Sequence, residues 1–546
     1  MTEPPQPPNQ PPTPSGYGHL PGPTPSGYGH PAQGPNPYAQ QPPTQPQQPA
    51  HPGYGYPPPP PGPPGMPPTA PGMPPKKKLT LLIAASVAGL LLVGGVGYVA
   101  FSNGDDDPEQ PVAQPSTPTD GKPSGSASPS VDDGDGSGGG TQNADLNSGR
   151  KQGEDKVLWY KTAKIDGPGM GVDSVGQWVV GDTVVKSVWK SLTAYSATDG
   201  KEKWTLPFPA LVCAVTNRAT PDGKTVVMYR DGDSESANCT QMRMVDLKTG
   251  KEGWSKEVPK EGLFDIFTSP TLSLTGDTVT VSRLGNASAF KISTGDKLFG
   301  SNQAEGCKPD SYEGGNGKMI ALATCADADT TAEVHGIDPV TGKKGWIFRL
   351  PKKAKVTSIY SVDPVVLDIG IEGSTDRSIL VLGPDGKQTA SLTGEGSFAT
   401  NCGGRGGLRS LSTCSSAVVD SGNLYLATSP AAGAANEIVA FDLAGGKVKW
   451  RTPAGDKRTI TPLKAEGGKL IFYRTAEEDR GGEILSIPAS GGTPTALLRH
   501  PSGPAAPIES SFSTPKLDYV DGRFFISATH LVARGKDEKL LMVFGK

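Results

Sequence analysis

One short phrase recurs along the C-terminal two-thirds of this chain of 546 residues. Each copy is an alternating strand, a polar turn that ends in glycine, and a large aromatic residue shortly after that glycine. The copies follow one another at intervals of about 45–50 residues, a repeat length typical of propeller blades or solenoid units. The clear copies are Leu192–Trp204, Met242–Trp254, Ala287–Phe299, Val334–Trp346 and Ile438–Trp450.

Each repeat holds four short segments with period-two alternation, which predicts a four-stranded propeller blade. Two weaker copies, Ser378–Ala390 and Glu483–Ala496, keep the glycine but have alanine at the aromatic position. The C-terminus supplies only three strands, and the segment around Trp159 resembles the missing fourth. Pairing the two ends would close the ring and hide strand edges. We therefore expect an all-β propeller, with eight blades favoured and seven as the alternative.

The turn chemistry agrees with this prediction. Asp246, Asp338 and Asp442 precede their glycines by four positions, where an Asp side chain can cap a turn. The glycine itself supplies the positive φ that a bulge at a hairpin requires. A small residue six positions before the glycine leaves room for an aromatic ring from an adjacent strand or blade; the small residues are Ala194, Ala289, Gly336 and Ala440.

The order of small residue, Asp, Thr-Gly and then Trp resembles the repeat of the pyrroloquinoline-quinone-like (PQQ-like) β-propeller family. The resemblance covers residues 154–546, the predicted propeller domain. That family includes quinoprotein alcohol dehydrogenases, an outer-membrane-assembly lipoprotein propeller and sensor domains of receptor kinases. The resemblance implies that the recurring aromatic residues dock neighbouring blades and are structural; they are Trp159, Trp204, Trp254, Phe299, Trp346 and Trp450.

The same resemblance implies where a quinone would bind, at the propeller axis beneath a disulfide between adjacent cysteines and beside a calcium ion. This sequence has no Cys-Cys dipeptide, and its degraded repeats argue against a complete cofactor cage. No HExxH, GxSxG or Walker-type motif occurs, and His335, His500 and His530 are isolated in the sequence. We expect no catalytic, cofactor-binding or metal-binding residues, no cofactor and no enzyme activity, with a diverged quinoprotein dehydrogenase as the competing class.

Six cysteines form three local pairs, Cys213 with Cys239, Cys307 with Cys325, and Cys402 with Cys414. None lies in a CxxC pattern, and no histidine has zinc-ligand spacing, so we expect no metal site. Six cysteines allow fifteen pairings. Pairing of nearest neighbours in three disulfides is the interpretation we favour, and free buried thiols are the alternative.

The N-terminal part has a different composition. Residues 1–75 are rich in Pro, Gly, Gln and Tyr, with too few apolar side chains to form a core, so we expect a disordered arm. Lys76, Lys77 and Lys78 precede an uncharged apolar segment, Leu79–Phe101, which is long enough to cross a bilayer. We read residues 76–101 as a signal-anchor, and the positive-inside rule then predicts a cytoplasmic arm and an extracytoplasmic propeller.

Residues 102–153 are rich in Ser, Gly, Asp and Pro and predict a flexible linker. A net charge of -3 gives no basic field for nucleic acid. We therefore expect a single-pass membrane protein whose non-catalytic propeller binds an envelope protein or a small ligand through its loops. An envelope-assembly accessory is a further alternative, and the Pro-rich arm is either a plain tail or a docking site for a cytoplasmic partner. Binding should involve segments that do not repeat, such as Asp231–Cys239 and Ser397–Cys414.

Overall fold

The computed structural model describes residues 145–167, 171–234, 236–301, 306–375, 377–398, 414, 416–430 and 434–546. The predicted arm, the predicted anchor with Lys76, Lys77 and Lys78, most of the predicted linker, and Cys402 lie outside these residues. Among the described residues, no helix is long and apolar enough to cross a membrane.

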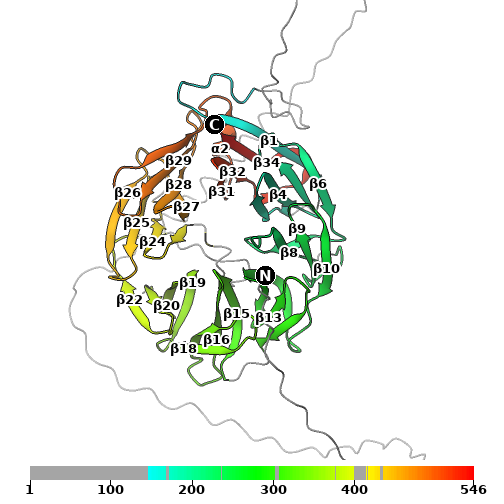
Figure 1. The fold of residues 1–546 in the computed structure, drawn as a ribbon, viewed down its shortest axis with the longest axis vertical. Helices are drawn as coiled ribbons and strands as arrows, with labels where there is room; N and C mark the ends of the chain where they lie inside the picture. The colour runs from blue at the N-terminus through cyan, green and yellow to red at the C-terminus, as the bar shows by residue number, and fades with distance from the viewer. Residues whose placement is uncertain are drawn as a thin grey trace, which may run out of the picture. The chain divides into compact units, whose positions relative to one another are not determined.

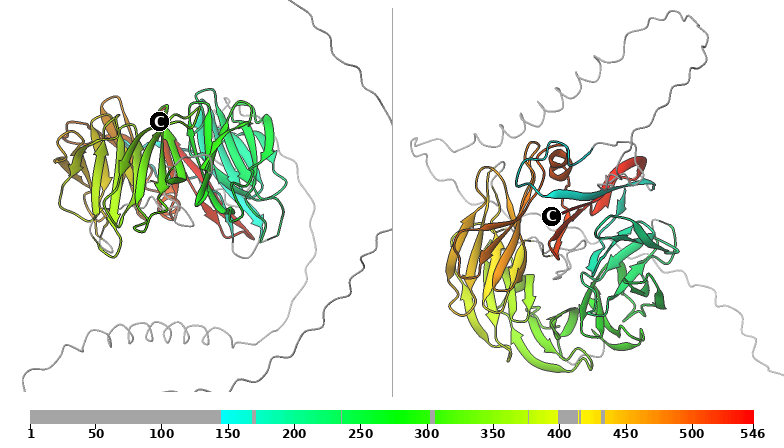
Figure 2. Two further views of the ribbon diagram at one scale, coloured as in Figure 1. Left: turned by 90° about the horizontal axis from the view of Figure 1, so that it is seen from below. Right: turned by 45° about the horizontal axis from the view of Figure 1, so that its top comes forward.

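Four-stranded antiparallel sheets stand around a common axis, each with one edge toward the axis and the other at the rim (Figure 1). The described residues form eight such sheets, which confirms the predicted eight-bladed, all-β propeller. Seen from its edge, the ring carries connections on both of its faces (Figure 2). We number the blades 1 to 8 in chain order, and the strands within each blade from the axis outward.

The strand bounds follow the predicted repeat closely. Blade 1 holds β3 (Gln177–Val180), β4 (Thr183–Val188), β5 (Ser191–Ser196) and β6 (Glu202–Pro207), and blade 2 holds β7 (Val212–Val215), β8 (Lys224–Tyr229), β9 (Gln241–Asp246) and β10 (Glu252–Glu257). Blade 3 holds β11 (Ile266–Thr275), β12 (Thr278–Leu284), β13 (Asn286–Lys291) and β14 (Lys297–Gly300), and blade 4 holds β15 (Lys308–Gly315), β16 (Lys318–Thr324), β17 (Ala332–Ile337) and β18 (Lys344–Arg349). Blade 5 holds β19 (Ala354–Val362), β20 (Val365–Ile371), β21 (Arg377–Leu382) and β22 (Gln388–Leu392), and blade 6 holds β23 (Ala417–Val419), β24 (Asn423–Ala427), β25 (Glu437–Asp442) and β26 (Val448–Pro453). Blade 7 holds β27 (Ile460–Glu466), β28 (Lys469–Arg474), β29 (Glu483–Pro488) and β30 (Thr495–Arg499), and blade 8 holds β31 (Lys516–Val520), β32 (Arg523–Ser527), β34 (Arg534–Gly545) and β1 (Lys156–Asp166).

The ends of the domain close the ring as predicted. Strand β1 pairs antiparallel with β34, and Trp159 lies opposite Val543 (Figure 1). A small second sheet, β2 (Val172–Asp173) with β33 (His530–Leu531), joins the same two parts of the chain. The folded unit begins earlier than residue 154, because the Asn147 side chain bonds both backbone groups of Val157. The N-terminal strand therefore supplies the rim strand of blade 8.

The hydrophobic cores lie between neighbouring blades. Trp178 and Val185 of blade 1, for example, pack with Val227 and Tyr229 of blade 2. Second strands such as β4 are buried along nearly their whole length because both faces of the sheet are covered, whereas the rim strand β6 alternates between exposed and half-buried residues. The predicted period-two alternation therefore appears in the burial of the rim strands and not in that of the second strands.

A short helix, α2 (Ala505–Ser510), braces the seam between blades 7 and 8. Its Glu509 carboxylate is buried and accepts hydrogen bonds from the Tyr473 hydroxyl (2.7 Å) and the Gly482 amide (3.0 Å). The His500 ring lies 2.7 Å from the same carboxylate through Nδ1 and stacks on Phe544. Burial, and then the neighbouring Glu509, raise the pKa of Tyr473 well above its usual value. The cluster is structural, since every member is enclosed in the core.

The capped turns between third and fourth strands are confirmed. The Asp246 carboxylate accepts the Lys248 amide at 2.8 Å, and the Asp338 carboxylate accepts the Thr341 amide at 2.7 Å. Gly250 has a φ of 72°, and a register shift marks the bulge beside it. The repeated turn residues are therefore occupied in building the hairpins.

Candidate functional site

The recurring aromatic residues lie at the junctions between blades. A Cβ atom added to Gly200 of blade 1 would come within 2.7 Å of the Trp159 indole of blade 8, so only glycine fits under the ring. The same contact joins each aromatic residue to the turn glycine of the next blade in five further pairs: Trp204 with Gly250, Trp254 with Gly295, Phe299 with Gly342, Trp346 with Gly386, and Trp450 with Gly491. The aromatic side chains are thus engaged in the junctions between blades.

Hydrogen bonds reinforce several of these junctions. The indole nitrogens of Trp159, Trp254 and Trp450 each donate to a backbone carbonyl of the next blade, at 3.2, 2.6 and 3.0 Å. Where the aromatic residue is lost, the junction changes: the turn glycine Gly446 lies against the backbone of Ser391 and near Ala390. The small residues lie opposite the aromatic residues of their own blade, as Ala194 does opposite Trp204.

The two faces of the ring carry different sequences. In an antiparallel blade, the connections between strands one and two and between strands three and four lie on one face, which we call the turn face. The connections between strands two and three and between successive blades lie on the other, the loop face. The repeated Asp and Gly residues lie on the turn face, so the segments that do not repeat are concentrated on the loop face.

The described cysteines all lie at the loop face. Two of the three predicted pairs are disulfides, Cys213–Cys239 and Cys307–Cys325. Cys414 is disulfide-bonded as well, and its partner lies outside the described residues. Disulfides persist in oxidising compartments, and the two described disulfides join residues 26 and 18 positions apart.

The predicted binding segment Asp231–Cys239 forms a braced loop on blade 2. Its ends are joined by backbone and side-chain hydrogen bonds between Asp231 and Asn238, both at 2.9 Å. Asp233 forms an ion pair of 2.7 Å with Lys190 of blade 1. The Cys239 amide donates to the Phe267 carbonyl, which fastens the loop to blade 3. Most of the other predicted segment, Ser397–Cys414, lies outside the described residues.

Beside this loop, the connection between β10 and β11 presents apolar side chains to solvent. Leu263 and Phe264 are 96% and 88% exposed. The next apolar residue, Ile266, is 45% exposed and pairs across the sheet with Leu284, which is 60% exposed. These four residues, here called the apolar tip, form an exposed cluster on the loop face of blade 3.

A buried charged network holds the base of the apolar tip. Arg283 binds both oxygens of Asp265, at 2.8 and 2.7 Å, and its guanidinium lies over the Phe267 ring. The Glu261 amide donates to Asp265 at 2.8 Å, and the Glu261 carboxylate accepts the Ser288 hydroxyl at 2.7 Å. Burial raises the pKa of Asp265, but the hydrogen bonds from Arg283 and Glu261 outweigh it and leave that pKa below its usual value. The loop is thereby closed on itself at its base.

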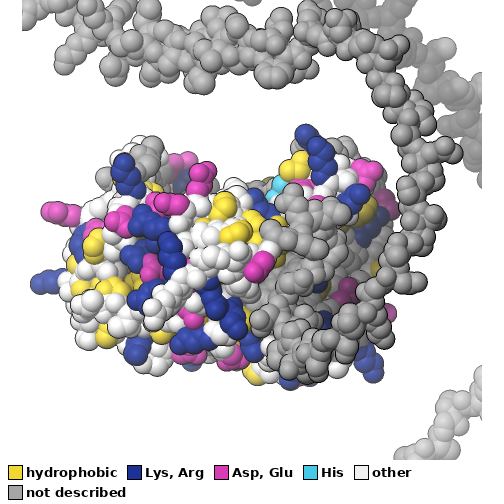
Figure 3. All heavy atoms as spheres, turned by 90° about the horizontal axis from the view of Figure 1, so that it is seen from above, with side chains coloured by type: hydrophobic (Ala, Val, Ile, Leu, Met, Phe, Trp, Pro, Cys, Tyr) yellow, Lys and Arg dark blue, Asp and Glu magenta, His cyan; other side chains and the backbone are white. Residues whose placement is uncertain are grey.

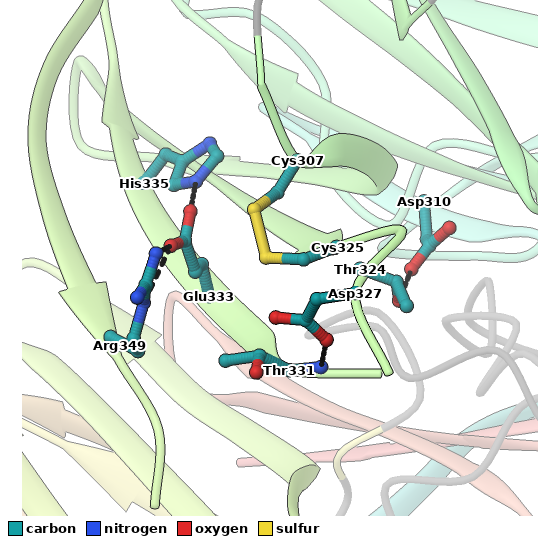
Figure 4. Close-up of a disulfide and its surroundings, with 9 residues drawn as sticks. All are labelled: Cys307, Asp310, Thr324, Cys325, Asp327, Thr331, Glu333, His335 and Arg349. Carbon is teal, nitrogen blue, oxygen red and sulfur yellow. Dashed lines mark hydrogen bonds and ion pairs between the residues drawn. A yellow bond between two sulfur atoms is a disulfide. The ribbon is translucent and has the colours of Figure 1, made fainter. Parts of the chain in front are cut away.

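Blade 4 brings a disulfide close to a charged pair (Figure 4). Cys307 and Cys325 lie near Glu333, the one described group whose spacing matches a metal site. The Glu333 carboxylate is already engaged, by Arg349 at 2.8 Å and by His335 at 2.8 Å. Burial lowers the pKa of His335 despite this contact. Because the sulfur atoms are bonded to each other, these residues do not fit a metal ion.

A cavity lies at the axis of the ring and is here called the axial channel. Its volume is about 660 Å³, and its wall is formed by the first strands of blades 3 to 8 together with Asn217 and Arg218 of blade 2. Lys516 reaches Asn217 at 2.8 Å, and Gln177 donates to Asp518 at 2.6 Å. Burial raises the pKa of Asp518. Behind this wall, burial and then the nearby Lys516 lower the pKa of Lys186 to about 7.

The described lining of the channel does not fit a calcium–quinone site. Calcium takes six to eight oxygen ligands, commonly from several carboxylates. The described lining offers the carboxylates of Asp363 and Asp518, of which Asp518 is already bonded to Gln177. Its aromatic member is Tyr360, whose hydroxyl donates to Asp368.

The surface carries charges of both signs, and the fold places the three described histidines at separate sites. On the side of the propeller drawn in Figure 3, Lys and Arg side chains are interspersed with Asp and Glu. His530 lies in the short strand β33, near Asp173. His335 and His500 stand alone in the sequence, but the fold pairs each with a buried glutamate.

The apolar tip was not predicted from the sequence, because the segment from Gly262 to Phe267 reads like a core strand. Only the position of this segment between two blades could have indicated that its side chains are exposed.

Comparisons with known proteins show what the chain is similar to. Residues 145–313 match the family model described as outer membrane protein assembly factor BamB. No curated protein sequence matches the chain. Among solved structures, BamB from Moraxella catarrhalis is 12% identical over 72% of this chain and 100% of its own, with a TM-score of 0.40. Quinohemoprotein alcohol dehydrogenase from Comamonas testosteroni is 15% identical over 72% and 76%, with a TM-score of 0.44. A europium-containing methanol dehydrogenase is 12% identical over 72% and 93%, with a TM-score of 0.41.

Those structural similarities are too low to carry function. The family-model match and the repeat, which continues through all eight blades, are independent of them. The propeller resembles the PQQ-like β-propeller family in the match of residues 145–313 and in the repeat that its blades share.

Proposed function

We propose that this chain is a single-pass membrane protein that displays a non-catalytic propeller outside the cytoplasm and binds an envelope protein through its loop face. The observation that carries this proposal is the division between the two faces. Residues that repeat are used to build turns and junctions, whereas the loop face combines disulfide-braced, non-repeating loops with an exposed apolar tip. Such a surface is suited to recognition of one partner.

The compartment is supported by two kinds of observation. The uncharged segment Leu79–Phe101 follows three lysines, as in an anchor with a cytoplasmic N-terminus. The disulfides Cys213–Cys239 and Cys307–Cys325 belong to an oxidising environment. A membrane-impermeant maleimide, applied to intact cells, should label a cysteine placed at Lys343 and leave one placed at Gln33 unlabelled. The opposite pattern would refute the topology.

A binding role is favoured over catalysis by the wall of the channel. The matched family model is named for an assembly factor, which supports a protein-binding role as well. Titrating the purified full-length protein with pyrroloquinoline quinone and Ca²⁺ should change neither the quinone absorbance nor the melting temperature. A saturable change in both would restore the dehydrogenase alternative.

Binding by the loop face is tested by site-specific photo-crosslinking in intact cells. A photoreactive amino acid at Ser236, in the braced loop of blade 2, should form an adduct of defined mass with a second protein. The same amino acid at Lys343, on the turn face of blade 4, should form none. An adduct from Lys343 alone would contradict the proposal, as would the absence of an adduct from Ser236.

A further inference from the structure

The apolar tip is unusual for the surface of a folded domain. Two adjacent large apolar residues, Leu263 and Phe264, are almost fully exposed, and the paired residues Ile266 and Leu284 continue the cluster. Single exposed apolar side chains are ordinary, but a contiguous group of them marks a contact surface. The repeat does not require these residues, since the other blades are joined without them.

The geometry beneath the tip shows that it is held in place. Asp265 follows the exposed pair directly, and its side chain is fully buried against Arg283. Glu261, on the other side of the pair, is buried and forms an ion pair of 2.6 Å with Lys297. Burying such charges is costly unless they are fully bonded, so the network favours a single conformation of the loop. A side chain fixed in this way loses little conformational freedom when a partner covers it.

We propose that Leu263 and Phe264 insert together into an apolar pocket of a protein partner, and that charged side chains of both signs border this pocket. The proposal rests on the proposed function and specifies how the loop face makes its contact. Recognition by insertion follows from the shape, because the exposed pair lies at the end of a loop. Aromatic and leucine side chains that fill a partner's pocket commonly dominate the binding energy.

The charges next to the tip favour a protein over a lipid surface. The braced loop of blade 2, which is fastened to Phe267 through Cys239, exposes Asp231 and Asp233, and Asp233 is paired with Lys190. The exposed Lys260 precedes the tip on its other side, so the tip is bordered by charges of both signs. A protein surface can match both signs, whereas a layer of anionic headgroups would repel Asp231. The tip alone is smaller than a usual interface, which buries roughly 800 Å² on each partner. The partner must therefore also cover the neighbouring braced loop of blade 2.

The test measures the adduct formed from Ser236 in the full-length chain. We expect Phe264→Ser to lower the adduct yield roughly tenfold or more, and Leu263→Ser to lower it by a smaller factor. The matched control is Val340→Ser, which removes a 64% exposed apolar side chain from the turn face and should leave the yield unchanged. Because these side chains contact solvent, the variants should keep the melting temperature of the parent protein.

The outcomes separate this inference from the proposed function. An unchanged adduct in Phe264→Ser would overturn the role of the tip and leave the proposed function standing, whereas no adduct from Ser236 in the parent chain refutes both. A photoreactive amino acid at position 264 that crosslinks to lipid and to no protein in intact cells would identify a bilayer as the occupant and overturn the inference. If the purified chain self-associates and Phe264→Ser abolishes this self-association, the occupant is a second copy of the chain, and the inference is overturned.

Discussion

Replacing a docking tryptophan by phenylalanine separates the two roles of the indole, which fills space against a glycine and donates a hydrogen bond. The Trp254 indole donates to the Ile292 carbonyl at 2.6 Å. The Trp204 indole nitrogen is buried, and it has no acceptor in the described part of the chain. Phenylalanine is compatible with the position, since Phe299 occupies it naturally. Trp254→Phe therefore loses ring volume and a hydrogen bond, whereas Trp204→Phe loses ring volume alone.

The expected difference follows from the carbonyl that Trp254→Phe leaves unpaired. A buried polar group without its partner costs about 1–3 kcal/mol, and the loss of ring volume is common to both variants. Trp254→Phe should thus lower the free energy of unfolding by about 1–3 kcal/mol more than Trp204→Phe. Urea unfolding of the full-length protein in detergent, followed by tryptophan fluorescence and circular dichroism, measures this difference from the midpoints and slopes. Equal destabilisation by the two substitutions would refute the role assigned to the indole hydrogen bond.

Three further predictions concern stability. Because burial lowers the pKa of Lys186 from 10.5 to about 7, the unfolded chain holds more protons between these values, so stability should rise from pH 7 to pH 9. Lys186→Met should flatten this rise in urea midpoints, and an unchanged slope would contradict the account. Cys239→Ser opens a disulfide that joins residues 26 positions apart and should lower the free energy of unfolding by about 3 kcal/mol. The urea midpoint of the variant should lie below that of the parent under non-reducing conditions, and the two midpoints should agree when both proteins are reduced. Glu509→Ala leaves several buried donors unpaired and should cost about 3 kcal/mol or more; a melting temperature equal to that of the parent would show that the seam does not depend on it.

Sequence periodicity was sufficient for the architecture because each blade repeats the same local chemistry. The degraded copies were correctly counted as blades, since Gly386 and Gly491 still lie against the aromatic residues of the preceding blades. The closing strand around Trp159 was recognised by its likeness to other rim strands, and helix α2 was missed because six residues give too little periodicity.

The candidate site was less predictable, because its features depend on contacts between segments far apart in sequence. The segment Asp231–Cys239 was singled out because it does not repeat, and its role in binding stays a prediction. The apolar tip was not singled out, because exposure cannot be read from the letters Leu263 and Phe264. The buried pair of Arg283 with Asp265 likewise needs the fold to bring together two positions on different strands.

The central claim is that the loop face of blades 2 and 3 is the binding surface. Hydrogen–deuterium exchange of the isolated complex, compared with the free chain, tests it most directly. The account predicts slower exchange in residues 231–239 and 260–266, with exchange unchanged in the turn at residues 338–343. Protection of the turn, or of the strands that line the axial channel, with none at residues 260–266, would contradict it.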